Sequence, residues 1–268
     1  MLKNRIITSA ILIIISITAI FFELPSALIL TILIVASLYE FFTMLQKKGI
    51  GTYKYFGTLM GAVIPLSITF RFELTKGWEL LFMVLGFLFL ILMQFKRKSN
   101  SGAIADISAT IFGIFYISWF LSFLIKIRYM PGGLGLLAAL LLITKSGDIG
   151  AYLIGSRFGR TPFIPRISPK KSVEGAFGGL AFSILAALVS KPLLNLSYPH
   201  VILIGIGLNV LAQLGDLSES LMKRDCEVKD SGSALPGMGG FLDLMDSFLF
   251  SAPCFYFYMN IVLKSLKI

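Results

Sequence analysis

The sequence predicts an all-α, polytopic integral membrane protein. Of its 268 residues, 56% are hydrophobic and 14% are charged, whereas soluble globular domains carry about 25% charged residues. The mean hydropathy is +0.87. The apolar stretches are long and continuous, and none alternates between apolar and polar residues as the strands of a membrane barrel do. Helices are the expected form of such stretches, because a helix satisfies its own backbone polar groups inside a bilayer.

Nine apolar segments are candidates for spanning helices, because a span needs about 20 mostly apolar residues. The first also resembles a secretory signal peptide. Its apolar run of about 17 residues exceeds the roughly 7 to 15 of such a peptide, and no small-residue cleavage site follows, so we expect a retained span. The third is short and the sixth and eighth have charged ends, so the expected total is about nine. The segments lie near 5–22, 25–45, 55–70, 78–95, 105–127, 133–155, 173–194, 200–220 and 244–264.

The polar groups divide the chain into two regions. Residues 1–130 form an amino-terminal set of transmembrane helices, and residues 131–268 form a carboxy-terminal region with the motif-bearing loops. Nine of the fourteen acidic residues lie between Asp148 and Asp246. Charge beside membrane-spanning segments is costly, so we expect these acids to be present for chemistry.

The basic residues predict the orientation. With a cytoplasmic amino terminus, the inside segments hold 16 Lys and Arg residues and the outside segments hold 7. An excess of Lys and Arg marks the cytoplasmic side. The loops at 156–172 and 221–243 are then expected to face the cytoplasm, in a cell inner membrane. Attraction of the basic loops to anionic lipid headgroups is a second explanation for the formal charge of +10.

The cysteines and the single histidine exclude several kinds of chemistry. Cys226 lies on an expected loop and Cys254 within a span, so neither a disulfide nor a zinc site is expected. His200 falls on the side opposite the basic loops, which excludes histidine-dependent triads and di-histidine metal sites. The chemistry is therefore expected to use carboxylates, cations, hydroxyls and backbone groups.

Two pairs of carboxylates suggest a metal site. Asp243 and Asp246 are three residues apart at the start of the last span, and Asp216 and Glu219 repeat that spacing at the end of the eighth. On helices, each pair would share one face. Mg²⁺ binds through one or two carboxylates together with substrate phosphates, so two such faces suit phosphate transfer. Acids at a helix amino terminus can also simply stabilise the dipole, which would account for Asp243 and Asp246 alone.

Cations and glycines surround these acids. Lys223, Arg224 and Lys229 interleave with them, and Ser220 lies one helical turn before Arg224. Cations beside metal-bound carboxylates can neutralise several phosphate oxygens, although in a soluble protein a salt-bridged loop would be the simpler reading. Glycines at 237, 239 and 240 allow backbone N–H groups to approach an anion. Together these residues favour a phosphate-binding loop.

A second polar cluster precedes the seventh span. Asp148 is expected inside a span three residues after Lys145, either as a structural ion pair or as part of a polar cavity. Ser172 is a candidate helix cap, and the lysines at 170 and 171 would add positive charge to a helix amino terminus that attracts phosphate. No P-loop motif is present.

In their order, these residues resemble the CTP-dependent phosphatidate cytidylyltransferases, also called CDP-diacylglycerol synthases. The resemblance covers about residues 145 to 250. Its first part is Asp148, Gly150-Ala151-Tyr152, Gly155, Gly159, Ser168-Pro169, Lys171, Glu174-Gly175 and Gly178-Gly179. Its second part is Leu214-Gly215-Asp216, Ser220, Lys223-Arg224, Lys229-Asp230, Gly232, Pro236-Gly237-Met238-Gly239-Gly240, Asp243-Leu244 and Asp246.

The resemblance implies the reaction CTP + phosphatidate → CDP-diacylglycerol + pyrophosphate, dependent on Mg²⁺. It implies metal ligands at Asp216, Asp243 and Asp246, aided by Asp148, and the number of carboxylates allows a second cation. Lys223 and Arg224 would act on the pyrophosphate or the lipid phosphate. The other expected substrate contacts are Ser168, Lys170, Lys171, Ser220, Lys229, Asp230, Gly239 and Gly240. The expected partners are CTP, phosphatidate, the lipid bilayer and a second copy in a homodimer, with no nucleic acid.

Two residues depart from the family signature. Met238 stands where the signature has His, and Leu244 where it has Arg. If these side chains touch phosphates in relatives, this chain does without them, which would give slower turnover or an altered substrate preference.

Two alternatives stay open at this stage. Another membrane enzyme that uses CTP, such as a polyprenol kinase or an archaeal-type lipid cytidylyltransferase, would carry similar polar residues. A cation transporter would also place Asp and Lys in spans, but it predicts polar residues towards the midplane and in both halves. In this chain they concentrate beside the glycine-rich loops.

Overall fold

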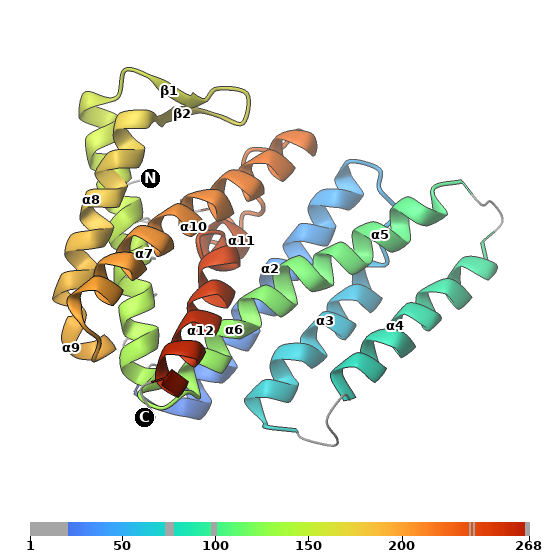
Figure 1. The fold of residues 1–268 in the computed structure, drawn as a ribbon. Helices are drawn as coiled ribbons and strands as arrows, with labels where there is room; N and C mark the ends of the chain where they lie inside the picture. Colours follow the sequence, from blue (N-terminus) through green and yellow to red (C-terminus); the bar gives the residue numbers. More distant parts are fainter. Residues whose placement is uncertain (1–20, 73–77, 98–100, 236, 238, 266–268) are drawn as a thin grey trace. The chain divides into compact units, whose positions relative to one another are not determined.

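The computed structural model describes residues 21–72, 78–97, 101–235, 237 and 239–265. These residues fold almost entirely as helices, which confirms the all-α prediction (Figure 1). The first predicted span, 5–22, lies outside the described residues except for its last two. The helices are α2 (Glu23–Lys47), α3 (Lys54–Thr69), α4 (Trp78–Phe95), α5 (Ala103–Gly113), the π-helix η1 (Ile114–Trp119), α6 (Phe120–Arg128), α7 (Gly133–Phe158), α8 (Val173–Val189), α9 (Lys191–Leu194), α10 (Tyr198–Asp225), α11 (Phe241–Met245) and α12 (Phe248–Ser265).

Each of the eight later apolar segments coincides with a helix or a run of consecutive helices. Within the described part of the chain, four runs are long and apolar enough to cross a membrane, at residues 23–47, 103–128, 133–158 and 198–225. Two further apolar helices, at 81–95 and 173–189, are shorter. The chain is thus a helical membrane protein, and the total of nine spans stays a prediction.

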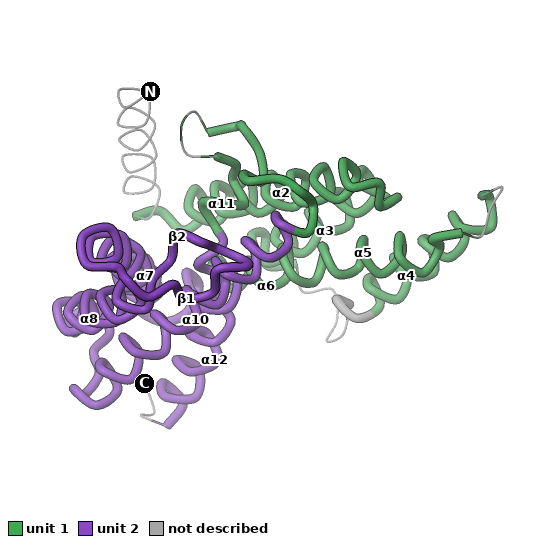
Figure 2. The backbone as a smooth tube through the Cα atoms, turned by 90° about the horizontal axis from the view of Figure 1, so that it is seen from above, with its two compact units in different colours: residues 1–125, 225–245 green, residues 126–224, 246–268 purple. Residues whose placement is uncertain are grey.

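The described chain forms two compact units (Figure 2). The first contains residues 1–125 and 225–245, and the second contains residues 126–224 and 246–268. The second unit begins near the predicted boundary at 130, but the glycine-rich segment before α12 groups with the amino-terminal helices. The functional motifs are therefore distributed over both units.

The first unit is built around α2. Its apolar face buries Ile34, Leu38, Phe41 and Phe42 completely or nearly so, and it packs against α3, η1 and α11. Glycine lets the helices approach one another, because a Cβ on Gly57 would lie 2.7 Å from the ring of Phe42. The contact between α11 and α2 joins the chain just before α12 to a helix about 200 residues earlier in the sequence.

The second unit depends on close packing of α7 against α8, which lie side by side in Figure 1. Glycines line the contact, since a Cβ on Gly178 would lie 2.5 Å from the Cβ of Ile154, and one on Gly179 would lie 3.0 Å from the carbonyl oxygen of Gly147. Small residues of this kind let helix backbones approach closely in membrane proteins, where van der Waals contact drives helix association.

A β-hairpin joins α7 to α8, and the sequence analysis did not anticipate it. Its strands β1 (Pro162–Ile164) and β2 (Ser168–Ser172) pair antiparallel, with Pro162 opposite Ser172 and a register irregularity before Ile164. The hairpin leads directly into α8, whose predicted cap is confirmed: Ser172 Oγ accepts a hydrogen bond of 3.1 Å from the N–H of Gly175. This cap sets where the lysine-bearing strand ends.

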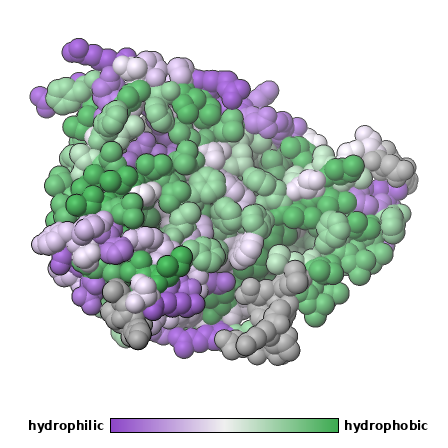
Figure 3. All heavy atoms as spheres, in the orientation of Figure 1, coloured by the Kyte–Doolittle hydropathy of each residue, from purple (hydrophilic) through white to green (hydrophobic). Residues whose placement is uncertain are grey.

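The surface fits a lipid environment. Large apolar side chains on the helices are exposed, with Ile261 69% and Leu203 55% accessible. Figure 3 shows apolar residues over much of the visible face and hydrophilic residues along its upper edge, where Figure 1 places the hairpin β1–β2. Apolar exposure on this scale is typical of surfaces that contact lipid.

Replacing Gly178 by Ala should loosen the α7–α8 contact. The added methyl group overlaps Ile154, and overpacking of this kind costs about 1–3 kcal/mol. We expect a lower midpoint of thermal unfolding in detergent, followed by tryptophan fluorescence or light scattering. Gly207→Ala is the matched control, since its Cβ would meet nothing within 4 Å. An equal midpoint in both variants would contradict the proposed role of this contact.

Candidate active site

A cavity of about 520 Å³ with charged residues in a largely apolar lining opens within the second unit, between α7, the hairpin, α8 and α10. Five residues predicted from the sequence line it: Asp148, Ser168, Lys170, Lys171 and Asp216. They come from three separate parts of the chain, and the glycine contacts between α7 and α8 bring two of those parts together. The cavity therefore gathers both signs of charge beside apolar helices.

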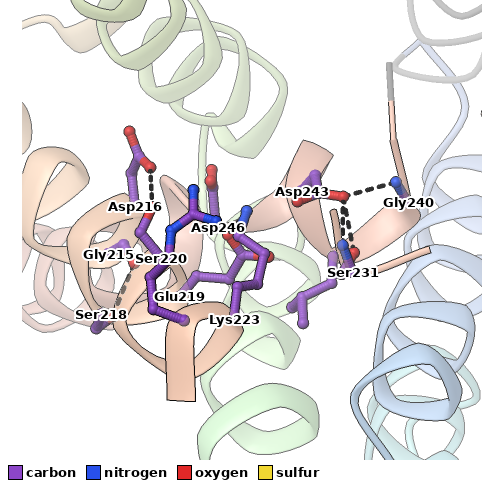
Figure 4. Close-up of polar contacts among 12 residues, drawn as sticks. Gly215, Asp216, Ser218, Glu219, Ser220, Lys223, Ser231, Gly240, Asp243 and Asp246 are labelled. Atoms are coloured by element: carbon purple, nitrogen blue, oxygen red, sulfur yellow. Dashed lines mark hydrogen bonds and ion pairs between the residues drawn. The ribbon is translucent and has the colours of Figure 1, made fainter. Parts of the chain in front are cut away.

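Asp216 forms the charged wall of the cavity on α10. Its carboxylate makes an ion pair with Lys171 from strand β2, and its Oδ1 accepts a hydrogen bond of 3.3 Å from Ser220 Oγ one helical turn later (Figure 4). Both members of the ion pair are about one third exposed. A phosphate that entered the cavity could therefore reach Lys171, and a cation could reach Asp216.

Asp148 on α7 belongs to an ion pair and also lines the cavity. The two alternatives given for it from the sequence, a structural ion pair and part of a polar cavity, are therefore compatible. Its Oδ2 lies 3.1 Å from Lys145 Nζ and accepts a hydrogen bond of 3.1 Å from Ser247 Oγ. Lys145 Nζ also lies 3.3 Å from that hydroxyl. The triad connects α7 to the chain just before α12.

Asp246 is buried, with 8% of its surface accessible. Its Oδ1 accepts a hydrogen bond of 2.5 Å from the backbone N–H of Ser247 and lies 2.9 Å from Ser247 Oγ, whose one hydrogen serves either Asp246 or Asp148. Its charge also interacts with those of Asp216, Asp148 and Lys145. Gly215 makes this approach possible, because any Cβ there would overlap the carbonyl oxygen of Asp246. The carboxylates of Asp216 and Asp148 thus both lie within electrostatic range of Asp246.

The predicted pairing of Asp243 and Asp246 on one helix face is wrong. Asp243 lies in the short helix α11, whereas Asp246 lies in the turn before α12, which begins at Phe248. The side chain of Asp246 bonds the next backbone N–H, and such local bonds compete with helix formation. Asp216 and Glu219, the other predicted pair, also have different partners. Asp216 forms an ion pair with Lys171, whereas Glu219 is fully buried and forms an ion pair with Lys223.

Asp243 belongs to the first unit and is held by its own loop. Its Oδ2 accepts hydrogen bonds from the N–H of Ser231 at 3.0 Å, Ser231 Oγ at 2.9 Å and the N–H of Gly240 at 2.7 Å (Figure 4). Its assignment as a metal ligand stays a prediction. In this arrangement Asp243 already organises the glycine-rich segment.

The glycine N–H groups expected at a phosphate are used inside the protein. Gly239 pairs with Leu235 through two backbone hydrogen bonds, and the N–H of Gly240 binds Asp243. Met238, one of the two departures from the signature, lies outside the described residues. A phosphate at this loop would have to replace these internal contacts.

The cations predicted near the acids lie in different settings. Lys223 is 10% exposed at its side chain and pairs with Glu219, while Arg224 Nε donates to the carbonyl oxygen of Ile167 at 3.4 Å, which joins the end of α10 to the hairpin. Lys229 and Asp230 are exposed on the segment that belongs to the first unit. Lys170 and Lys171 are thus the predicted cations that line the cavity.

The cavity also includes residues that the sequence analysis missed. Phe163 and Gln213 line it beside Tyr152, which the family resemblance already included, and Gln213 Nε2 donates to the carbonyl oxygen of Ala176 at 3.3 Å. A glutamine inside an apolar span is a signal that could have been used. Phe163 gave no such signal, because aromatic side chains are common throughout the chain.

The donor set fits Mg²⁺ that arrives with a nucleotide. Among the described residues, no group of three or more Asp, Glu, His or Cys side chains is placed to hold a metal ion. Mg²⁺ needs only one or two carboxylates when substrate phosphates supply further oxygens. Asp148 and Asp216 are hard oxygen donors in the lining of the cavity, and Asp246 lies within range of their charges, so an ion shared with substrate suits these acids better than one enclosed by protein.

Comparison with known proteins places these features in a family. Residues 3–262 match the sequence model of the cytidylyltransferase family. The phosphatidate cytidylyltransferase of Bacillus subtilis is 32% identical over 96% of this chain and 97% of its own length. That of Thermotoga maritima is 32% identical over 97% of both chains, and that of Synechocystis is 32% identical over 89% of both. The chain belongs to the cytidylyltransferase family.

Proposed function

We propose that this protein transfers the cytidylyl group of CTP to phosphatidate, forming CDP-diacylglycerol and pyrophosphate. Family membership and the names of the full-length relatives support this assignment. The observation that carries it is the second-unit cavity, in which the ion pair between Asp216 and Lys171 lies within electrostatic range of Asp246. A triphosphate needs cations for its oxygens and carboxylates for its accompanying metal, and this cavity contains both.

The proposed reaction needs no general base. The phosphate group of phosphatidate is already ionised at neutral pH, so one of its oxygens can attack the α-phosphorus of CTP while pyrophosphate leaves. Lys170 and Lys171, with the hydroxyl of Ser168, bind and orient the triphosphate along the hairpin. Asp216 and Asp246, aided by Asp148, would hold Mg²⁺, which when bound supplies neutralisation of phosphate charge.

The other predicted residues have supporting roles in the proposal. Ser220 orients Asp216 through the hydrogen bond to Oδ1. Lys223 and Arg224 are assigned to the pyrophosphate or lipid phosphate, and Lys223 must exchange its pairing with Glu219 to reach one. Asp243, Lys229, Asp230, Gly239 and Gly240 complete the proposed set from the first unit.

The setting of the enzyme is part of the same proposal. The excess of Lys and Arg in alternate loops supports an inner-membrane location with the cavity facing the cytoplasm. About nine spans, a second cation and a homodimer are proposed with it, the second cation from the number of carboxylates and the homodimer from the family resemblance alone. CTP is a cytoplasmic nucleotide, so this orientation would give the cavity direct access to it.

Product identification tests the function. Purified protein is incubated with labelled CTP, Mg²⁺ and phosphatidate, with a polyprenol as a competing acceptor, and the lipids are identified by mass spectrometry. We expect CDP-diacylglycerol and pyrophosphate in equal amounts. A phosphorylated polyprenol with release of CDP would instead identify a lipid kinase.

Asp216→Asn and Asp246→Asn should each lower kcat for CDP-lipid formation by about a hundredfold or more, since each removes a proposed ligand and metal-site losses reach this size. Turnover is measured in detergent micelles, with the unfolding midpoint as a check of folding. Glu23→Gln is the matched control, because Glu23 is an exposed acid at the start of α2. Wild-type turnover in either variant would refute the metal assignment.

Lys171→Gln should raise the KM for CTP by about tenfold to a hundredfold, because charge-assisted hydrogen bonds contribute about 1.5–3 kcal/mol. Lys191→Gln, which removes a lysine stacked on Tyr198 at the far end of α8, is the control. Initial rates at varied CTP and fixed phosphatidate give the constant. An unchanged KM would place the triphosphate away from β2.

A further inference from the structure

Glu40 is a buried acid on α2 that the sequence motifs do not include. It lies within an apolar helix long enough to span a membrane, and 8% of its surface is accessible. A carboxylate in such a place is expensive unless it is hydrogen-bonded. An apolar residue at this position would avoid that cost. We therefore expect the contacts of Glu40 to show why an acid is present here.

Among the described residues, the hydrogen bonds of the Glu40 carboxylate lead to Ser231 and Leu242, at the two ends of the glycine-rich segment 231–243. Its Oε2 accepts a hydrogen bond of 3.0 Å from the N–H of Leu242 and lies 3.3 Å from Ser231 Oγ. These partners are 202 and 191 residues away in the sequence, and they belong to the same compact unit as α2. Glu40 therefore connects an amino-terminal helix to the part of the chain that carries the end of the family signature.

Two glycines of the segment are shaped around this carboxylate. A Cβ on Gly232 would lie 2.7 Å from Glu40 Cδ, and the three atoms nearest to it would all belong to Glu40. A Cβ on Gly240 would overlap Glu40 Oε2 and would lie 2.7 Å from the N atom of Gly232. These glycines thus leave room for a carboxylate of the protein itself, in addition to allowing a phosphate to come close to the backbone.

Ser231 links Glu40 to Asp243. Its Oγ lies 2.9 Å from Asp243 Oδ2 and 3.3 Å from Glu40 Oε2. A hydroxyl has one hydrogen to donate, so it serves one carboxylate at a time. Backbone N–H groups supply further donors, that of Leu242 to Glu40 and those of Ser231 and Gly240 to Asp243. The fold of this segment consequently depends on both carboxylates together.

A second contact attaches the start of the same region to α2. Lys48, just after the helix, forms an ion pair with Asp225, which raises the pKa of the lysine above its usual value. That pair is exposed, and exposed pairs contribute little to stability. Glu40 is therefore the stronger of the two connections.

We propose that Glu40 is a positioning residue for cytidylyl transfer, which holds segment 231–243, and Asp243 with it, in its working conformation on α2. This inference rests on the proposed function. Glu40 does not line the second-unit cavity, so its loss should affect the rate of reaction rather than the binding of CTP.

The first test compares Glu40→Leu, which removes the acceptor, with Glu40→Gln, which keeps an oxygen for Leu242. We expect Glu40→Leu to lower kcat by about tenfold, as expected for loss of one charge-assisted hydrogen bond. The Kd for CTP should stay within about twofold, because direct contacts in the cavity are unchanged. Glu40→Gln should retain most activity, and Glu23→Leu at the start of the same helix is the control.

The second test is a double-mutant cycle. Gly232→Ala alone should lower kcat, because its methyl group meets Glu40. In a Glu40→Ala background the overlap is gone, so adding Gly232→Ala should change kcat by less than about twofold. Fully additive effects of the two substitutions would overturn the proposed contact.

Hydrogen exchange supplies a readout that does not depend on activity. The amides of Gly240 and Leu242 should exchange about tenfold faster in Glu40→Leu than in wild type, while that of Gly175, capped in the other unit, should not change. If the wild-type protein makes no CDP-lipid, the proposed function is wrong. The exchange rates would still show whether Glu40 holds the segment on α2.

Each outcome decides the proposal. Wild-type kcat in Glu40→Leu overturns it, whether or not the exchange rates rise, and so does an equal fall of kcat and CTP affinity. If Glu40→Leu does not fold, Glu40→Gln is compared with Glu40→Asp, whose shorter side chain withdraws from Leu242. Activity in the first and loss in the second supports the proposal, and equal loss in both overturns it.

Discussion

The structure depends on how carboxylates are compensated among apolar helices. A charged group that loses its water must gain hydrogen bonds or an opposite charge, because desolvation of an isolated carboxylate costs several kcal/mol or more. Asp216 has Lys171, Asp148 has Lys145 and Ser247, and Asp246 has Ser247. Two of these contacts, that of Asp216 with Lys171 and that of Asp148 with Ser247, join different segments of the chain, so compensating the acids also determines which segments meet. The same contacts that stabilise the fold assemble the cavity.

Glycine makes these contacts between segments possible in two ways. Between α7 and α8 it lets two backbones approach, as at Gly178 and Gly179, and so places the hairpin beside α10. In the segment after α10 it makes room for a side chain, since Gly232 and Gly240 surround Glu40. The glycine-rich signature therefore has a structural explanation within the protein, in addition to the phosphate contact that such a sequence suggests.

The sequence predicted the helices well, because apolar runs of this length have one stable form in lipid. It also grouped Asp148, Ser168, Lys170, Lys171 and Asp216 through the order of their motifs, and all five line one cavity. The hairpin was missed, since strands of three and five residues leave no readable period. The helix expected at Asp243 and Asp246 is interrupted by a local hydrogen bond that spacing does not reveal. Glu40 was missed because its partners are about 200 residues away.

The position of the metal ion in a complex with nucleotide tests the proposed site most directly. A crystal of the protein with Mn²⁺ and a non-reactive CTP analogue would give an anomalous peak at the ion. We predict a peak beside the carboxylates of Asp216 and Asp246, with Lys171 moved from Asp216 to the triphosphate. A peak elsewhere in the protein, with the pair between Asp216 and Lys171 intact, would contradict the assignment of the cavity as the site of cytidylyl transfer.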